Sequence, residues 1–371
     1  MPPADSRDTV PFNDLGRGVR AIRSELDAAV ARVLDSGWYV LGPEHDAFES
    51  ELAASLGAAH AVGLANGTDA LELGLLALGV GRGDLVATVA NAGGYTSTAV
   101  RKIGATPVYV DVDEHTLQMS PQSLRELLAA SATVPKVVVI THLFGNVGEL
   151  VELAAIAREA GARVLEDCAQ SLGAVVDGKA AGTFGDLATT SFYPTKNLGA
   201  LGDGGGIVTD DADLAARVRR LRQYGWESKY AASTPGGRNS RLDELQAAIL
   251  RVRLPLLAAG NDRRRDIHRA YEAADRSGLL VNAAGPSYVA HLAVLRTPDR
   301  DAVREAFRAA GVLTDVHYPI PDHRQVVAGG AELVVPLPVT ERAAAEILSI
   351  PMFPELRDDE VARISDVLGA L

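Results

Sequence analysis

The chain has 371 residues, 47% hydrophobic and 23% charged, which is ordinary for a globular protein with a sizeable core. Its formal net charge of −12 argues against nucleic acid as the main partner, and its single cysteine excludes an intramolecular disulfide and is typical of a reducing compartment. Residues 1–16 have no apolar signal core and no apolar run reaches membrane-spanning length, so we expect a cytoplasmic protein that does not bind membranes.

Short apolar runs alternate with amphipathic stretches through the first two thirds of the chain. This pattern predicts strands at 61–64, 85–89, 107–110, 136–141 and 163–167, with helices at 68–76, 97–103 and 151–159 between them. Near-continuous apolar strands separated by helices indicate an α/β fold with a mostly parallel sheet covered on both faces. Ligands of such a sheet bind at the carboxyl ends of its strands.

The last third of the chain predicts a second, smaller unit. Residues 242–268 have helical spacing that Pro255 should interrupt. A strand at 288–295 and a helix at 301–310 follow. We therefore expect a large domain at 1–250 and a small α+β domain at 251–371, with roughly the first forty residues packing against the small one.

Lys196 and Asp167 carry the most informative pattern. Lys196 lies between a cluster of hydroxyl side chains and the glycine-rich run 202–206, where backbone can approach a flat ligand closely. Asp167 ends an apolar strand. A lysine that forms a Schiff base and an aspartate that pairs with a pyridinium nitrogen are the two groups that pyridoxal 5'-phosphate (PLP) requires. Taken singly, the lysine could be a surface residue and the aspartate a helix cap.

Other residues could hold the remaining parts of such a cofactor. The turn Asn66–Asp69 joins an apolar strand to an apolar helix, where free amides and the helix dipole favour a phosphate; an N-cap by Thr68 is the simpler alternative. Ser191 could add a hydroxyl. Tyr95 is placed to stack on a planar ring, and Gln170 could reach its phenolic oxygen, although each could also be structural.

Five ordered motifs together resemble one family. The chain is similar to the DegT/DnrJ/EryC1/StrS sugar aminotransferases of the aspartate aminotransferase superfamily, almost from end to end. The motifs that carry the resemblance are NGTDAL at 66–71, EDCAQ at 166–170, SFYPTKNLG at 191–199, GDGGG at 202–206 and NSRLDELQAAIL at 239–250.

The resemblance implies a fold and a set of roles. The fold would be that of fold type I PLP enzymes: a three-layer α/β/α large domain with a mostly parallel seven-stranded sheet, plus the smaller C-terminal domain. The cofactor would be PLP, with pyridoxamine phosphate as its intermediate form, and no metal. Lys196 would bind the cofactor covalently and Asp167 its ring nitrogen. The other matching cofactor contacts are Gln170, Tyr95, Gly67, Thr68, Ser191 and Asn239, the last reaching the neighbouring subunit's phosphate in a homodimer with shared active sites.

The sequence departs from the family pattern at two places. Asn91-Ala92-Gly93-Gly94 replaces the usual stretch before the ring-stacking aromatic. Asp322 stands where leucine is frequent, in the segment that begins with His317, Tyr318 and Pro319. The first departure affects the geometry of the loop before Tyr95, and the second affects a segment to which the resemblance gives a substrate role.

For substrates, the resemblance implies L-glutamate as amino donor and a nucleotide-linked keto-deoxysugar, with dTDP favoured, as acceptor. A diphosphate needs basic residues, for which Arg238, Arg241 and Lys229 are candidates, whereas the run 263–265 predicts a solvated helix face. Tyr224, Arg241, His317 and Tyr318 are the predicted substrate contacts. The segment Thr68-Asp69-Ala70-Leu71 and the pair Tyr224-Gly225 resemble those of members that aminate carbon 3 of the sugar, so we expect carbon 3 rather than carbon 4. Deoxyaminosugar synthesis for an antibiotic is one expected setting.

Two other functions compete with this prediction. A PLP-binding regulatory protein would keep the cofactor but not turn over, and the chain has no basic DNA-binding segment to support it. A nicotinamide dehydrogenase would need Gly-x-Gly-x-x-Gly after the first strand, and the glycine run at 202–206 comes too late.

Overall fold

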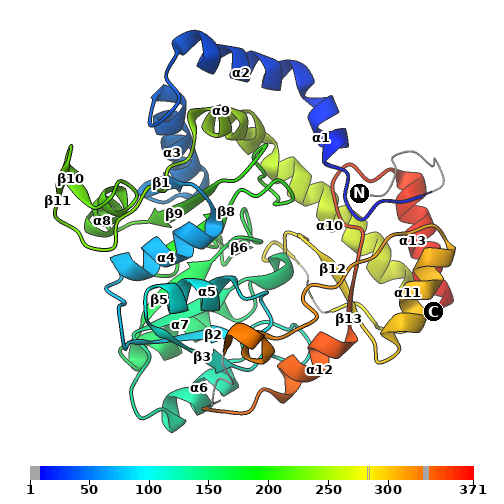
Figure 1. The fold of residues 1–371 in the computed structure, drawn as a ribbon. Helices are drawn as coiled ribbons and strands as arrows, with labels where there is room; N and C mark the ends of the chain where they lie inside the picture. Colours follow the sequence, from blue (N-terminus) through cyan, green and yellow to red (C-terminus); the bar gives the residue numbers. More distant parts are fainter. Residues whose placement is uncertain (1–8, 282, 284, 329–333) are drawn as a thin grey trace.

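A seven-stranded sheet forms the centre of the protein (Figure 1). The computed structural model describes residues 9–281, 283, 285–328 and 334–371. The strands lie in the order β1 (His60–Leu64), β9 (Gly205–Thr209), β8 (Leu187–Ser191), β5 (Arg163–Asp167), β4 (Val137–Thr141), β2 (Leu85–Val89) and β3 (Thr106–Val110). β9 is antiparallel to both of its neighbours and the other pairs are parallel, which confirms the predicted mostly parallel sheet.

Helices cover both faces of this sheet, which confirms the three-layer architecture. One face carries α4 (Gly67–Ala77), α5 (Tyr95–Lys102) and α8 (Ala212–Leu221), and the other carries α6 (Pro121–Ala130) and α7 (Leu150–Glu159). The strands are buried on both sides, as their near-continuous apolar sequences require. On β1 and β9, α3 (Pro43–Leu56) and α9 (Glu244–Arg253) complete a further cluster around Phe48 and Phe192.

Pro255 interrupts the helical segment after residue 242, as the sequence predicts. α9 ends at Arg253, the short 3-10 helix η2 (Leu254–Leu256) contains the proline, and α10 (Leu257–Ala274) begins directly after it. Figure 1 shows α10 running from α9 to the C-terminal elements. This helix therefore connects the sheet-bearing part of the chain to the rest.

The C-terminal elements form their own apolar cluster. The pair β12 (Ala293–Arg296) and β13 (Ile347–Ile350) packs with α10, α11 (Arg300–Ala309) and α13 (Asp358–Ala370). The N-terminal segment joins them, because Val10 lies in this cluster and Arg17 of α1 (Leu15–Ala21) pairs with Glu360 at 2.6 Å. In contrast, α2 (Arg23–Ser36) packs on α9 through Ala29 and Val33. The boundary at residue 250 stays a prediction.

The strand expected at 288–295 is wrong over most of its length, since β12 begins only at Ala293. The preceding carbonyls do not pair with a strand. Ala290 O accepts a hydrogen bond from the buried Arg264 guanidinium at 3.3 Å, and Leu292 O accepts one from the Tyr288 hydroxyl at 2.8 Å. Hydrogen bonds from a buried arginine thus replace the strand-to-strand hydrogen bonds that an apolar sequence alone would predict.

The remaining elements are short or peripheral. They are the pairs β6 (Val175–Val176) with β7 (Lys179–Ala180) and β10 (Trp226–Ser228) with β11 (Ala231–Ala232), the helix α12 (Pro338–Glu346), and the 3-10 turns η1 (Leu143–Gly145), η3 (Asp322–Arg324) and η4 (Val326–Ala328). Within the described ranges, no helix combines the length and apolarity that crossing a bilayer demands.

Candidate active site

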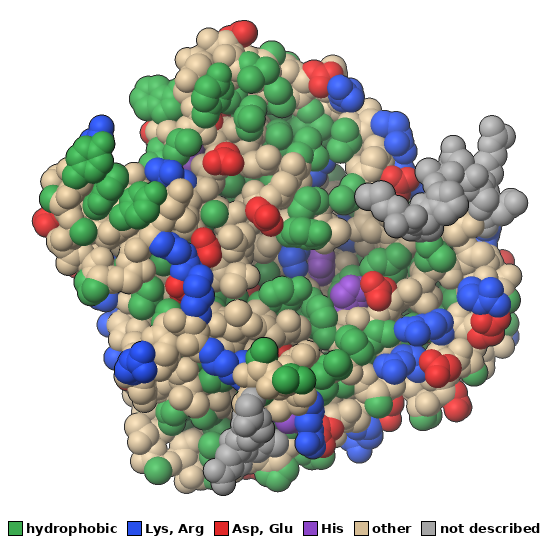
Figure 2. Space-filling view, viewed as in Figure 1, with side chains coloured by type: hydrophobic (Ala, Val, Ile, Leu, Met, Phe, Trp, Pro, Cys, Tyr) green, Lys and Arg blue, Asp and Glu red, His purple; other side chains and the backbone are tan. Residues whose placement is uncertain are grey.

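A cavity of about 690 Å³ lies where the parallel strands end. Most of the predicted cofactor and substrate residues line it: Gly67, Thr68, Tyr95, Asp167, Gln170, Ser191, Lys196, His317 and Tyr318. Figure 2 shows this face of the molecule hollowed near its centre, with histidine, basic and acidic side chains gathered there. Residues that are up to 251 positions apart in sequence, Gly67 and Tyr318, are thus brought to one place by the sheet.

Asp167 is the last residue of β5 and is only 6% exposed. Its Oδ1 accepts a hydrogen bond from the Ala169 amide at 3.1 Å, the only hydrogen bond of this carboxylate within the described ranges. Burial raises the pKa of Asp167, while the Ala169 amide and the charges of Lys196 and His142 oppose that rise. A buried carboxylate with an oxygen left over is suited to a cationic N–H.

Lys196 lies in the loop between β8 and β9, and local hydrogen bonds fix this loop. The Lys196 amide donates to Tyr193 O at 2.8 Å. Next to it, Asn197 Nδ2 donates to Asn261 Oδ1 at 2.8 Å and to Val289 O at 3.0 Å, which ties the loop to α10. Burial lowers the pKa of Lys196 to about 8, against the opposing effect of Asp167. The amine therefore becomes neutral, and nucleophilic, at a pH much closer to 7 than the amine of an ordinary lysine does.

The N-terminus of α4 forms a cradle for an anion. Asn66 caps the helix, because its Oδ1 accepts from the Asp69 amide at 2.8 Å; the N-cap is thus Asn66 and not Thr68. The first amides of a helix have no partner within it and remain for a ligand. Space beside them depends on glycine: a Cβ on Gly67 would lie 2.7 Å from Ser191 Cβ, and one on Gly205 would lie 2.3 Å from the Asn66 carbonyl.

Tyr95, Gln170 and Tyr318 surround the cavity on another side. The Tyr95 and Tyr318 rings meet edge to face, with centroids 6.0 Å apart. Gln170 Oε1 accepts from the Phe144 amide at 2.6 Å, and Gln170 Nε2 lies 3.5 Å from the Tyr318 hydroxyl. The side-chain amide of Gln170 is thereby oriented with its NH₂ group toward the cavity.

His317 is held by residues from two other segments. Its Nδ1 lies 3.0 Å from Ser349 Oγ, and its ring stacks on Phe12 with centroids 5.5 Å apart. Burial lowers the pKa of His317, with Asp315 opposing, so the ring is neutral at pH 7.

The cavity is also lined by residues that were not predicted to contact a ligand, among them Phe12, Asn13, Asp203, His291 and Asp315. Asp203 lies in the glycine-rich run, which is a signal that could have identified it. His291 hydrogen-bonds Asn197 Oδ1 through Nδ1 at 2.9 Å, a contact between loops that no sequence pattern reveals. Phe12 and Asn13 belong to the N-terminal segment, and their position at the cavity also depends on long-range packing that no sequence pattern reveals.

Three predicted residues lie outside the cavity of this chain. Asn239 and Tyr224 are exposed, and Arg241 is partly buried, but none of them lines the cavity. Their predicted roles stay predictions.

Two expectations about basic residues are wrong. Arg238 is not free for a diphosphate, because it pairs with Asp69 at 2.7 Å and with Glu72. The run 263–265 is not a solvated face throughout, since Arg264 is 5% exposed and donates to Met352 O at 2.7 Å. Lys229 stays available, with its ammonium 5.2 Å from the Tyr230 ring centre.

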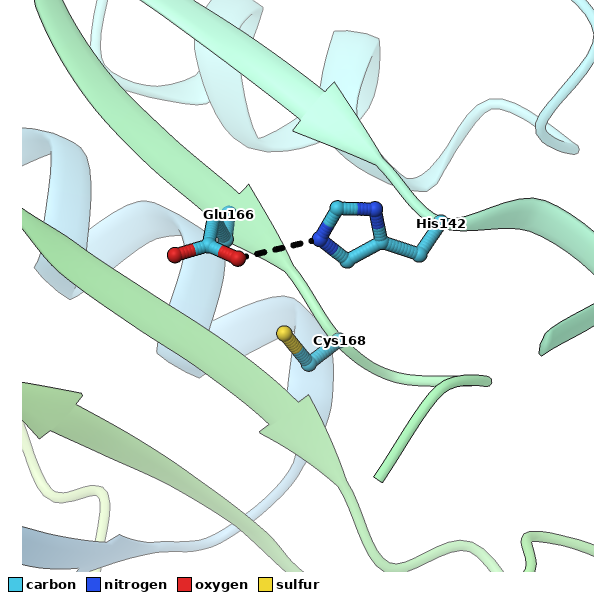
Figure 3. Close-up of side chains that lie close together, drawn as sticks. All are labelled: His142, Glu166 and Cys168. Atoms are coloured by element: carbon cyan, nitrogen blue, oxygen red, sulfur yellow. Dashed lines mark hydrogen bonds and ion pairs between the residues drawn. The ribbon is translucent and has the colours of Figure 1, made fainter. Parts of the chain in front are cut away.

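Among the described residues, one group of three side chains has metal-ligand types in close proximity: His142, Glu166 and Cys168 (Figure 3). The donor atoms are already used. Glu166 accepts from the amides of Gly182, Phe184 and Gly185 at 2.7–2.8 Å and pairs with His142 Nε2 at 3.1 Å. Burial, together with Glu166, raises the pKa of the Cys168 thiol well above its usual value, so no thiolate forms. The cluster instead fixes the end of β5, next to Asp167.

The residues present fit PLP. The cavity combines a buried carboxylate, an amine of lowered pKa, a helix N-terminus with glycine-sized space and an aromatic ring at its edge. These groups match the ring nitrogen, the aldehyde, the phosphate and the ring face of that cofactor.

The sequence profile of the DegT/DnrJ/EryC1/StrS aminotransferase family matches residues 20–369. The chain belongs to this family. Membership confirms the prediction from the sequence that the protein is a PLP-dependent aminotransferase with the fold described above.

Characterised relatives match over nearly the whole chain. It is 41% identical to the UDP-N-acetyl-3-dehydro-alpha-D-glucosamine 3-aminotransferase of Acidithiobacillus ferrooxidans, with 97% of each chain covered. It is also 41% identical to the dTDP-3-amino-3,4,6-trideoxy-alpha-D-glucose transaminase of Streptomyces venezuelae, over 97% of this chain and 95% of the relative. The crystal structure of S. venezuelae DesV in complex with a ketimine intermediate superposes with a TM-score of 0.92, at 40% identity and 98% coverage of both chains.

The lowered pKa of Lys196 predicts the pH dependence of cofactor capture. Only the neutral amine attacks an aldehyde, and below pH about 8 the neutral fraction falls about tenfold for each pH unit. The initial rate at which the cofactor-free protein develops its visible absorption band with PLP should rise from pH 6.5 and level off above about pH 9. A rate that keeps rising through pH 10 would show an ordinary lysine instead.

Proposed function

We propose that the protein transfers the amino group of L-glutamate to the keto group of a dTDP-linked keto-deoxysugar, at carbon 3, in deoxyaminosugar synthesis. The observation that carries the proposal is the placement of Lys196 and Asp167 on one cavity beside a helix N-terminus. Two relatives at 41% identity act at carbon 3 by their names, one on a UDP sugar and one on a dTDP sugar. Carbon 4 is the alternative position.

The residues of this chain would hold the cofactor as follows. The N-terminal amides of α4 at Gly67 and Thr68, with Ser191 Oγ, bind the phosphate. Tyr95 packs against the ring, and Gln170 Nε2 donates to its phenolic oxygen. Asp167 accepts the N–H of the pyridine ring, and a cation there offsets the burial that raises the carboxyl pKa. PLP, when bound, supplies an electron sink that stabilises negative charge on the adjacent carbon.

Lys196 is the residue that would transfer the α-proton of glutamate. Its Nζ, neutral above pH about 8, can accept the α-proton of glutamate, and the resulting ammonium can return a proton to the neighbouring carbon. Asp167 opposes the lowering of this pKa, which keeps both forms accessible near neutral pH. His317 and Tyr318, with a neutral imidazole and a phenol at the cavity, are placed to hydrogen-bond the sugar.

The anionic substrates require cations that one chain does not supply. Among the described residues that line the cavity, Lys196 is the only lysine or arginine. Glutamate carries two carboxylates and the sugar nucleotide a diphosphate, and both classes of anion are bound best by arginine or amide donors. We infer a cytoplasmic homodimer in which Asn239 of one subunit reaches the phosphate bound by the other, with Arg241 and Tyr224 contacting the sugar nucleotide.

The substrate proposal is tested in two half-reactions. PLP-loaded protein given L-glutamate should lose its visible band and release 2-oxoglutarate. The amine form should regain the band with a dTDP-3-keto-6-deoxysugar. The 4-keto isomer should react at least about tenfold more slowly, because its carbonyl and hydroxyl groups are exchanged between carbons 3 and 4, which leaves a polar group of the site unpaired. A faster reaction with the 4-keto sugar would reverse the regiochemistry, and no response to glutamate would refute the aminotransfer.

Shared sites predict complementation between two impaired variants. Lys196→Ala removes the amine, and Asn239→Ala weakens cofactor retention when PLP is limiting. If Asn239 acts across the dimer, a mixed dimer contains one intact site, so random mixing should restore about 25% of wild-type activity.

The control for this experiment is Lys196→Ala mixed with Asp167→Ala, whose residues line the same cavity of one chain. Those mixed dimers contain no intact site, because each subunit brings a cavity with its own defect. Activity from the first mixture no higher than from the control would place Asn239 outside the shared site.

A further inference from the structure

A buried carboxylate outside the cavity joins the two segments that carry Tyr95 and Tyr318. Asp322 lies in η3 and is 1% exposed. Its Oδ2 accepts a hydrogen bond from Ser97 Oγ at 3.0 Å, in the first turn of the helix that begins with Tyr95. Its backbone amide donates to Ala90 O at 2.8 Å, directly after β2. The segment 317–324 is therefore attached to the N-terminus of α5 through one residue.

The two departures from the family's motifs meet at this contact. Gly93 and Gly94 both have positive φ, 77° and 80°. A Cβ on Gly93 would lie 2.9 Å from the Tyr318 ring, and one on Gly94 would lie 3.8 Å from Asp322 Oδ1. Gly93 thus leaves room for the Tyr318 ring. At Gly94 the positive φ, and not a lack of space, is what favours glycine.

We propose that Asp322 is a positioning residue that sets the separation of Tyr95 and Tyr318, and with it the space for the cofactor ring and the reacting carbonyl. It acts from outside, since Asp322 itself does not line the cavity. Tyr95 is 51% exposed and its ring contacts Tyr318 only edge to face, so little else on its outer side holds it. The tie through Ser97 determines where its helix begins.

The raised pKa of Asp322 distinguishes a positioning role from a role in stabilising the fold. Burial raises its pKa to about 6, against the opposing effects of the Ser97 hydroxyl, the Gly94 backbone amide and Arg101 of α5. Tyr109 of β3 and His323 of η3 are the other titratable groups near it. A carboxyl whose folded pKa lies above its unfolded value stabilises the fold only at low pH, and this contribution is lost as pH rises through about 6. At pH 7.5 the charged group therefore opposes folding.

The test compares Asp322→Leu and Asp322→Asn with a matched buried aspartate. Asp111 is 4% exposed and accepts from the amides of Val339 and Thr340 at 2.9 and 2.8 Å, so it also joins the sheet region to a C-terminal element, but it does not line the cavity. Each PLP-loaded variant is measured at pH 7.5 for its visible circular dichroism per bound cofactor, which reports ring orientation, and for its Tm.

For both Asp322 variants we expect the dichroic amplitude to fall by about half or more, because the ring loses its fixed neighbours, with Tm unchanged or raised. Asp111→Asn should lower Tm and leave the dichroism unchanged. Ser97→Ala should reproduce the dichroic loss, and combining it with Asp322→Asn should add nothing further.

Wild-type dichroism and a lowered Tm in both Asp322 variants would overturn the proposal and make Asp322 a structural residue like Asp111. Additive losses from Ser97→Ala and Asp322→Asn would equally overturn it, because the tie would not be the cause. If Asp322→Leu fails to fold, the near-isosteric Asp322→Asn decides the question. The readout concerns bound PLP and not the sugar, so a wrong sugar assignment leaves this test intact.

Discussion

The site depends on a buried carboxylate and a desolvated amine being delivered to one cavity by neighbouring parallel strands. Asp167 ends β5, and Lys196 follows β8, which pairs with β5 in parallel register. Each group perturbs the pKa of the other: Asp167 opposes the fall at Lys196, and Lys196 opposes the rise at Asp167. This arrangement keeps a reactive amine opposite an acceptor for a pyridinium N–H. Displacing either strand end would remove the chemistry even if every other contact remained.

Much of the structure serves to fix those two strand ends. Within β5, the fully buried Glu166 binds His142 and three amides of the turn before β8, so one carboxylate organises both strands. Burial would raise the pKa of Glu166, but these donors hold it below its usual value. The loop after Lys196 is tied through Asn197 to α10, the helix that leads to the C-terminal elements. Those elements in turn supply His317 and Tyr318 to the cavity.

The sequence predicted the parts of this arrangement that depend on local pattern. Apolar strands ending in Asp167 and a turn at Asn66–Asp69 are local signals, and the strand ends of a parallel sheet meet by geometry. It could not predict contacts that depend on distant packing, such as Phe12 against His317 or His291 against Asn197. It also mistook Arg264 for a surface residue, because a charged side chain buried on backbone carbonyls has the same sequence as a solvated one. The length of the strand at 288–295 was overestimated because the hydrogen bond from Arg264 to Ala290 O has no signal in the local sequence.

The position at which the cofactor is covalently attached would show whether Lys196 is the reactive amine. The PLP-loaded protein is reduced with borohydride, which makes the bond between amine and cofactor permanent, and is then digested and mapped by mass spectrometry. We expect the cofactor on the peptide that contains Lys196, at about one per chain. Asp167→Ala protein keeps this lysine, so we expect label at the same site and at no other. Label on another lysine, such as the exposed Lys229, or no label at all, would contradict this expectation.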